Sequence, residues 1–263
     1  MIDNQERLTQ QPLSKGEGKS SHIEMTKEVI ERSAFENFLR LSGQCFEGFQ
    51  SAKVPEPDIV AWRGNERFGI EVTNFYRQKE RQQESEEDSI VSLARKHYEA
   101  KGGPCLHVDI DWVPNHRIAR SQRDAFAREI ADLVGANVPT LRAWVELDWS
   151  SFSKALIVAL HHVTINRLVD YERNYWHAGR SGLVPLLSPS VFQSALDRKN
   201  AKPKNYRGQY SEIWLLVVST YHEPSSWVEM TEHARGTTYQ SVFDRVFLLS
   251  SFPIDVFELR LRR

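Results

Sequence analysis

Two carboxylates stand beside two short apolar runs, at a spacing that could hold a divalent cation. Asp58 opens the run 59–62, and Glu71 lies within the run 68–73. Both runs are rich in Ile, Val, Phe and Trp, and the segment 63–66 between them contains a Gly-Asn pair. Such a pair supplies the positive φ values of a tight hairpin turn. The pattern therefore predicts a β-hairpin that carries both carboxylates.

The expected register of this hairpin places the two carboxylates opposite each other. If Gly64 and Asn65 are the turn residues, Asp58 pairs with Glu71, and directly opposed Cβ atoms lie roughly 5 Å apart. Because residues alternate between the faces of a strand, both carboxylates fall on the non-core face, opposite that of Ile70. Two like charges so placed destabilise a sheet. A bound divalent cation would offset their repulsion.

The composition of the whole chain is that of an ordinary soluble globular protein. Its 263 residues are 40% hydrophobic and 26% charged, with a formal net charge of -1. No apolar run reaches the roughly 18 residues of a membrane helix, so we expect no membrane partner, and the polar N-terminus favours the cytoplasm. Two cysteines are too few for a disulfide framework or a four-cysteine zinc site. Any nucleic-acid binding requires a local basic patch.

The segments before the hairpin predict a tail, a helix and a strand. Residues 1–20 are polar and aperiodic, which is typical of a disordered tail. A capping box of Ser21 and Glu24 begins the predicted helix, and Gly43 ends it. A short strand at 45–49 would complete a helix followed by three antiparallel strands.

Glu36 is a third acidic residue on the predicted helix. Arg32 and Arg40 lie four residues to either side of it, which is typical of a surface ion-pair ladder. The alternative is that Glu36 joins the carboxylates of the hairpin.

A second informative stretch predicts a helix at 190–203 followed by a buried strand at 212–218. The core-facing stripe of this helix turns polar at Lys199 and Lys202, and Tyr206 continues the line. One interpretation is that the two lysines belong to a site beside the strand. The alternative is that the helix leaves the core and its lysines reach water, which Pro203 favours because it disrupts helix.

The remaining segments predict further helices and strands. They are a charged loop or helix start at 77–88, a helix ending at 101–103, a strand at 106–112, a helix at 117–135, strands at 141–147 and 155–165, a turn or short helix at 171–176, and a C-terminal hairpin of 242–250 with 256–261.

Histidines in the strand segments offer a second metal hypothesis. His107, Asp109 and Asp111 alternate on one face of the predicted strand, where they could ligate a metal. A solvent-facing strand explains the same pattern, and we favour it. His161 and His162 point to opposite faces of a strand and cannot act on one substrate atom together.

The motif residues resemble the PD-(D/E)xK nuclease superfamily, whose core is that of the restriction endonucleases. The resemblance is carried by Pro57-Asp58, by Glu71-Val72-Thr73 after twelve intervening residues, and by Lys199, Lys202 and Tyr206. Thr73 departs from the pattern, because this position normally holds lysine. Some members are thought to supply the lysine from the following core helix, and Lys202 to Tyr206 matches the spacing of the Gln-x-x-x-Tyr motif.

The resemblance implies an α/β fold in which a mixed β-sheet core is flanked by helices. The core would comprise about 21–75 and 188–263, with a large α/β insertion at about 76–187, all within a single domain from 21 to 263.

The resemblance also implies hydrolysis of phosphodiester bonds in DNA. Asp58 and Glu71 would hold Mg²⁺, for which Mn²⁺ can substitute, and Lys202 or Lys199 would stabilise charge at the scissile phosphate. Glu36 would hold a metal-bound water, and Lys96 is the fallback lysine. The expected partner is nucleic acid, with DNA as the first candidate, and a homodimer is compatible with it. The residues expected to contact nucleic acid are Arg198, Lys204, Tyr206 and Arg207.

A second hypothesis follows from the threonine at position 73. A chain with this fold and no motif lysine could be catalytically inactive and serve as a nucleic-acid-binding or protein-interaction module.

Overall fold

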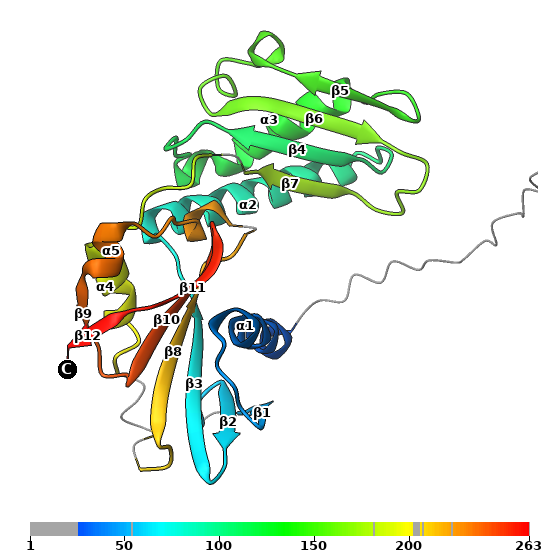
Figure 1. The fold of residues 1–263 in the computed structure, drawn as a ribbon. Coiled ribbons are helices and arrows are strands. Elements are labelled where there is room, and N and C mark those ends of the chain that lie inside the picture. The colour runs from blue at the N-terminus through cyan, green and yellow to red at the C-terminus, as the bar shows by residue number, and fades with distance from the viewer. Residues whose placement is uncertain are drawn as a thin grey trace, which may run out of the picture.

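The chain forms two large β-sheets, each with its own buried apolar cluster, as a computed structural model shows (Figure 1). The structure describes residues 26–53, 55–180, 182–201, 206, 208–221 and 223–262. The larger sheet has six strands in the order β1-β2-β3-β8-β10-β11, and the smaller has four in the order β5-β6-β4-β7. This mixed α/β architecture, with a mixed sheet flanked by helices, confirms the predicted fold class at that level.

The predicted hairpin is present with the predicted register. Strands β2 (Ile59–Arg63) and β3 (Glu66–Asn74) pair antiparallel, and Trp62 lies opposite Arg67. Gly64 has a φ of 58°, as the turn requires. β1 (Gly48–Ser51) pairs antiparallel with β2 and begins three residues later than the predicted 45–49.

The centre of the larger sheet is β8 (Glu212–Val218), which confirms the buried strand predicted there. It runs parallel to β3 on one side and to β10 (Arg245–Ser251) on the other. β11 (Ile254–Glu258) pairs antiparallel with β10, as the predicted C-terminal hairpin requires. Two short strands, β9 (Thr238–Gln240) and β12 (Arg260–Arg262), pair separately.

Helix α1 (Lys27–Ser42) covers one face of the larger sheet (Figure 1). The side chain of Thr26 caps its N-terminus, and Gly43 ends it in a left-handed conformation, as predicted. Phe38 is buried and packs against Phe247 at 4.8 Å between ring centroids. The predicted tail 1–20 and the capping box of Ser21 and Glu24 lie outside the described residues.

The opposite face of the larger sheet is covered by α4 (Pro189–Asp197) and the short α5 (Glu232–Gly236). α4 ends at Asp197, so the predicted helix 190–203 is too long. Leu196 is the last buried side chain of this helix. In the turn that follows, the backbone N–H groups of Lys199 and Asn200 donate to the Leu196 carbonyl. The four residues after Leu196 are Asp, Arg, Lys and Asn, so none of them is an apolar side chain that could hold a further helical turn against the sheet.

The segment between β3 and α4 builds the four-stranded sheet. Two helices cover one of its faces, and the other face is open (Figure 1). The elements are α2 (Gln78–Glu99), β4 (His107–Trp112), α3 (Arg123–Ala136), β5 (Ala143–Leu147), β6 (Leu160–Arg167) and β7 (Tyr175–Gly179), with 3-10 turns η1 (Arg120–Gln122) and η2 (Trp149–Ser151) here and η4 (Pro224–Ser226) after β8.

Several sequence predictions for this segment are corrected by the structure. Of the two interpretations of the charged run 77–88, the helix start is confirmed, because the run forms the first half of α2. The segment 155–159 forms turns, and the strand begins only at Leu160. The region predicted as a turn or short helix at 171–176 leads into strand β7. Among the described residues, no helix is long and apolar enough to cross a membrane.

Candidate functional site

A cavity of about 540 Å³ lies over the carboxyl ends of β3 and β8. In open α/β sheets, ligands bind in the crevice outside the carboxyl ends of the strands. The walls come from α1, the end of β3, the end of α4 and the end of β8. The lining residues that bear on function are Lys27, Glu31, Thr73, Arg198 and Lys199.

Asp58 and Glu71 lie next to this cavity, since Asp58 contacts the lining residue Lys27 and Glu71 directly precedes the lining residue Val72. Asp58 directly precedes β2, and its Oδ2 accepts a hydrogen bond from the backbone N–H of Val72 at 2.9 Å. This contact continues the hairpin ladder by one position and fixes the Asp58 carboxylate next to Glu71. The side chain of Asp58 is 13% exposed and Glu71 is 1% exposed. The prediction that Glu71 lies on a non-core face of β3 is therefore wrong, because α4 and its neighbours cover that face of the sheet as well.

The buried carboxylate of Glu71 is hydrogen-bonded to the phenol of Tyr206. The Tyr206 hydroxyl donates to Glu71 Oε1 at 2.8 Å. Burial first, and then the hydrogen bond and charge of Glu71, raise the pKa of Tyr206. The phenol therefore stays protonated and donates. Tyr206 is buried in the apolar cluster that also contains Leu196, and its expected contact with nucleic acid stays a prediction.

Glu31 is an acidic residue of this site that sequence reasoning missed. It lies on α1 with a side chain that is 14% exposed. Burial raises its pKa, against the hydrogen bond from Lys27, and the charges of Asp58 and Glu71 raise it further. Glu31 is thus repelled by the carboxylates of Asp58 and Glu71 beside the carboxyl end of β3.

Lys27 reaches the same group from the first turn of α1. Its ammonium lies 2.9 Å from Glu31 Oε1 and 3.3 Å from Asp58 Oδ1. The hydrogen bond to Glu31, opposed by partial burial, raises the pKa of Lys27. Lys27 is therefore a protonated cation between two carboxylates.

The other predicted residues lie as follows. Glu36 pairs with Arg32 at 3.0 Å on the exposed side of α1, which fits the surface ion-pair alternative. Arg198 and Lys199 line the cavity. Lys96 is exposed on α2. It lies about 27 Å along the helix axis from the cavity residue Gln78, eighteen residues earlier in α2. Three predicted residues lie outside the described ones, namely Lys202, Lys204 and Arg207.

The donor set at this edge suits a hard cation. Asp58, Glu71 and Glu31 offer only carboxylate oxygens, which Mg²⁺ prefers, and Mg²⁺ is commonly held by one or two carboxylates together with substrate phosphates. Within the described part of the chain, no three His, Cys, Asp or Glu side chains converge closely enough to hold a metal by themselves. The residues fit a metal held by two carboxylates and completed by substrate.

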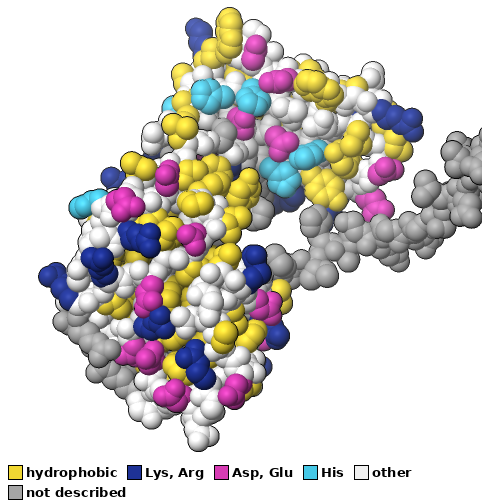
Figure 2. All heavy atoms as spheres, in the orientation of Figure 1, with side chains coloured by type: hydrophobic (Ala, Val, Ile, Leu, Met, Phe, Trp, Pro, Cys, Tyr) yellow, Lys and Arg dark blue, Asp and Glu magenta, His cyan; other side chains and the backbone are white. Residues whose placement is uncertain are grey.

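Histidines gather on the open face of the four-stranded sheet, seen in the upper half of Figure 2. His107 lies 3.3 Å from Asp109, and His162 lies 2.8 Å from Asp111. These His–Asp contacts are pairs on a solvent-facing sheet surface, as the favoured interpretation of the alternating pattern expects.

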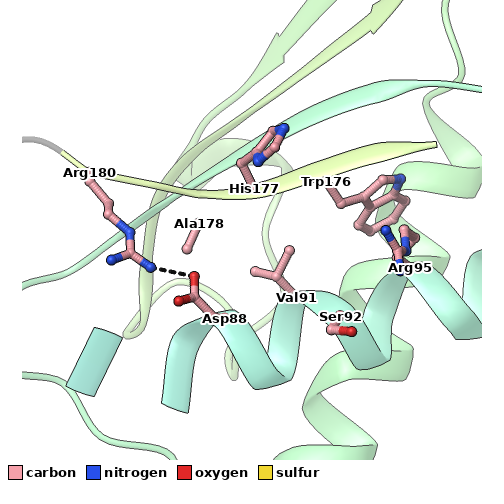
Figure 3. Close-up of a pocket in the computed structure, with 8 residues that line it drawn as sticks. All are labelled: Asp88, Val91, Ser92, Arg95, Trp176, His177, Ala178 and Arg180. Carbon is pink, nitrogen blue, oxygen red and sulfur yellow. Dashed lines mark hydrogen bonds and ion pairs between the residues drawn. The ribbon is translucent and has the colours of Figure 1, made fainter. Parts of the chain in front are cut away.

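A second cavity, of about 370 Å³, lies between α2 and β7 (Figure 3). Its charged groups neutralise one another. Arg180 forms an ion pair with Asp88 and lies 3.4 Å from Glu84, and Arg95 lies 3.7 Å from Glu99. This cavity therefore has no concentration of like charge, in contrast to the carboxylates at the end of β3, which make the first cavity the candidate site.

Comparisons with protein-family models, with curated proteins and with solved structures find no match to this chain.

Proposed function

We propose that this protein is a metal-dependent nuclease that hydrolyses phosphodiester bonds of DNA. The observation that carries the proposal is that the backbone N–H of Val72 holds the Asp58 carboxylate beside Glu71 on β3, with the charge of Glu31 facing both. Asp58 and Glu71 would hold Mg²⁺, with Glu31 beside them. The motif spacing of Asp58 and Glu71 in the PD-(D/E)xK pattern supports the same assignment.

Each group in the cavity has a task in this reaction. Mg²⁺ held by Asp58 and Glu71 would supply an activated water and positive charge for the phosphate. Lys27, Arg198 and Lys199 would contact phosphate oxygens from opposite walls of the cavity, because compact or forked cations are the usual partners of phosphate. Tyr206 holds Glu71 in place through its hydrogen bond.

DNA cleavage by purified protein, with and without Mg²⁺ or Mn²⁺, tests the proposal. We expect cleavage only with a divalent metal, and its loss in Glu71→Ala and Glu71→Gln. Glu36→Gln is the matched control, since it removes a glutamate from the exposed side of α1 and should retain activity. Metal-independent cleavage, or full activity in Glu71→Gln, would show the proposal to be wrong.

Thr73 favours one specific alternative, a nuclease-like fold that binds nucleic acid without cleaving it. Threonine stands at the position where the resembled family normally has lysine. In that case DNA binding persists, cleavage is absent with every metal tried, and charge reversal at Lys199 weakens binding.

A further inference from the structure

The position that normally carries the motif lysine holds an uncharged side chain in the cavity wall. Thr73 lies on β3 opposite Val217 of β8, and both line the cavity over the carboxyl ends of these strands. A phosphate beside Asp58 and Glu71 therefore finds no cation on β3 itself. The charge that stabilises it has to come from another element.

We propose that Lys27, on α1, supplies the cationic group that β3 lacks at Thr73. The inference rests on the proposed nuclease function and assigns a residue to it. Lys27 lines the same cavity as Thr73 and contacts Asp58 at 3.3 Å. Through the other oxygen of Asp58, this lysine is linked to the backbone N–H of Val72, which lies between Glu71 and Thr73.

The contrast in exposure between Lys27 and its partners suits an exchange of partners. The Lys27 side chain is 78% exposed, whereas Glu31 and Asp58 are almost buried. An ion pair of such an exposed lysine contributes little to stability. The flexible ammonium can therefore leave a carboxylate for a phosphate oxygen at little cost, while the carboxylates stay where the fold holds them.

Lys27 acts on charge that develops at the phosphate. Its ammonium has three N–H donors and no acceptor, so it can keep one contact with Glu31 and donate another to a phosphate oxygen. Removal of one hydrogen-bond donor to the charge that develops in the transition state commonly lowers kcat by about 10²–10³. Lys199 is the competing candidate, since it lines the cavity from the end of α4.

The test compares DNA cleavage rates of Lys27→Ala, Lys199→Ala and the double variant Lys27→Ala/Thr73→Lys. We expect Lys27→Ala to lower kcat about 10²–10³-fold. The double variant Lys27→Ala/Thr73→Lys should cleave at least about tenfold faster than Lys27→Ala, because Thr73→Lys returns a cation to β3. Lys53→Ala is the matched control, because Lys53 is an exposed lysine outside the cavity lining, and it should cleave like wild type.

The outcomes separate this inference from the proposed function. If wild-type protein cleaves and Lys27→Ala retains a rate within about threefold, the role of Lys27 is wrong while the nuclease proposal stands. If Lys27→Ala loses cleavage and the double variant does not recover it, Lys27 has a structural role and the inference is wrong. If wild-type protein fails to cleave with any metal, the proposed function is wrong and the inference falls with it.

Discussion

Asp58 has two separable roles, and substitution can remove them one at a time. Its Oδ2 accepts the hydrogen bond of the Val72 backbone, and its charge faces Glu31 and Glu71. Asp58→Asn keeps an acceptor oxygen and removes the charge, whereas Asp58→Ala removes both. We expect Asp58→Asn to fold normally and to lose cleavage, and Asp58→Ala to lose cleavage and stability together.

The sizes of these effects follow from the surroundings of Asp58. In Asp58→Ala the half-buried N–H of Val72 loses its acceptor, which costs about 1–3 kcal/mol of unfolding free energy. At about 2–4 °C per kcal/mol for a chain of this size, Tm should fall by roughly 2–12 °C. In Asp58→Asn the exposed pair with Lys27 is lost, about 0–1 kcal/mol, but repulsion with Glu31 and Glu71 is relieved. The two changes oppose each other, so stability should stay within about 1 kcal/mol of wild type.

Thermal unfolding with EDTA and with Mg²⁺ measures both roles in one experiment. At a metal concentration of 100 times Kd, binding to the folded state adds about 2.7 kcal/mol, and this increment should be present in wild type and lost in Asp58→Asn. Equal destabilisation of the Asn and Ala variants in EDTA would refute the hydrogen-bond role. Equal stabilisation of wild type and Asp58→Asn by Mg²⁺ would refute the metal role.

Two further predictions concern the core under α1 and a buried glutamate on α2. Phe38→Ala should cost about 3–5 kcal/mol, because Phe38 is buried against Trp214 and Phe247; urea unfolding measures it, and a cost below about 1 kcal/mol would contradict this packing. Burial raises the pKa of Glu87 above its value in the unfolded chain, so wild type loses stability as pH rises through the raised pKa. Glu87→Gln, which keeps an acceptor for Gln83, should be the more stable protein at alkaline pH, with a difference that shrinks as pH falls; a Tm difference that does not change with pH would contradict it.

The larger sheet was predictable because its strands carry strong local signals. A Gly-Asn turn between two apolar runs fixes Gly64 and Asn65 as the turn residues and thereby the register, and the observed pairing of Ile59 with Ile70 has that register. The continuous apolar run 212–218 required burial on both faces, which a central parallel strand provides.

The sequence left a loop and a helix start open for the first half of α2 because its buried positions are charged. Glu84 and Glu87 are buried where a helix normally has apolar residues, so the segment has no apolar period to read. Glu84 is satisfied by the backbone N–H and the hydroxyl of Ser225, both at 2.6 Å. A partner 141 residues away along the chain leaves no local signal.

The acidic residue on α1 could have been found from the stripe of the helix. Lys27 and Glu31 extend toward the N-terminus the same three-to-four-residue spacing that carries Ala34 and Phe38 into the core. Polar residues that continue a buried stripe must end in a polar site or in water. Glu36 lies off this stripe, which is why it faces Arg32 at the surface.

The site therefore depends on the packing of α1 as much as on the hairpin. The hairpin places Asp58 and Glu71, and Phe38 of α1, which packs on Trp214 and Phe247, brings Lys27 and Glu31 to them. A loosened α1 would separate Lys27 and Glu31 from the other two carboxylates without disturbing the hairpin register. Phe38→Ala should for this reason lower cleavage under conditions where the protein is still folded, whereas an equally destabilising substitution in the four-stranded sheet should leave the rate of the folded protein unchanged.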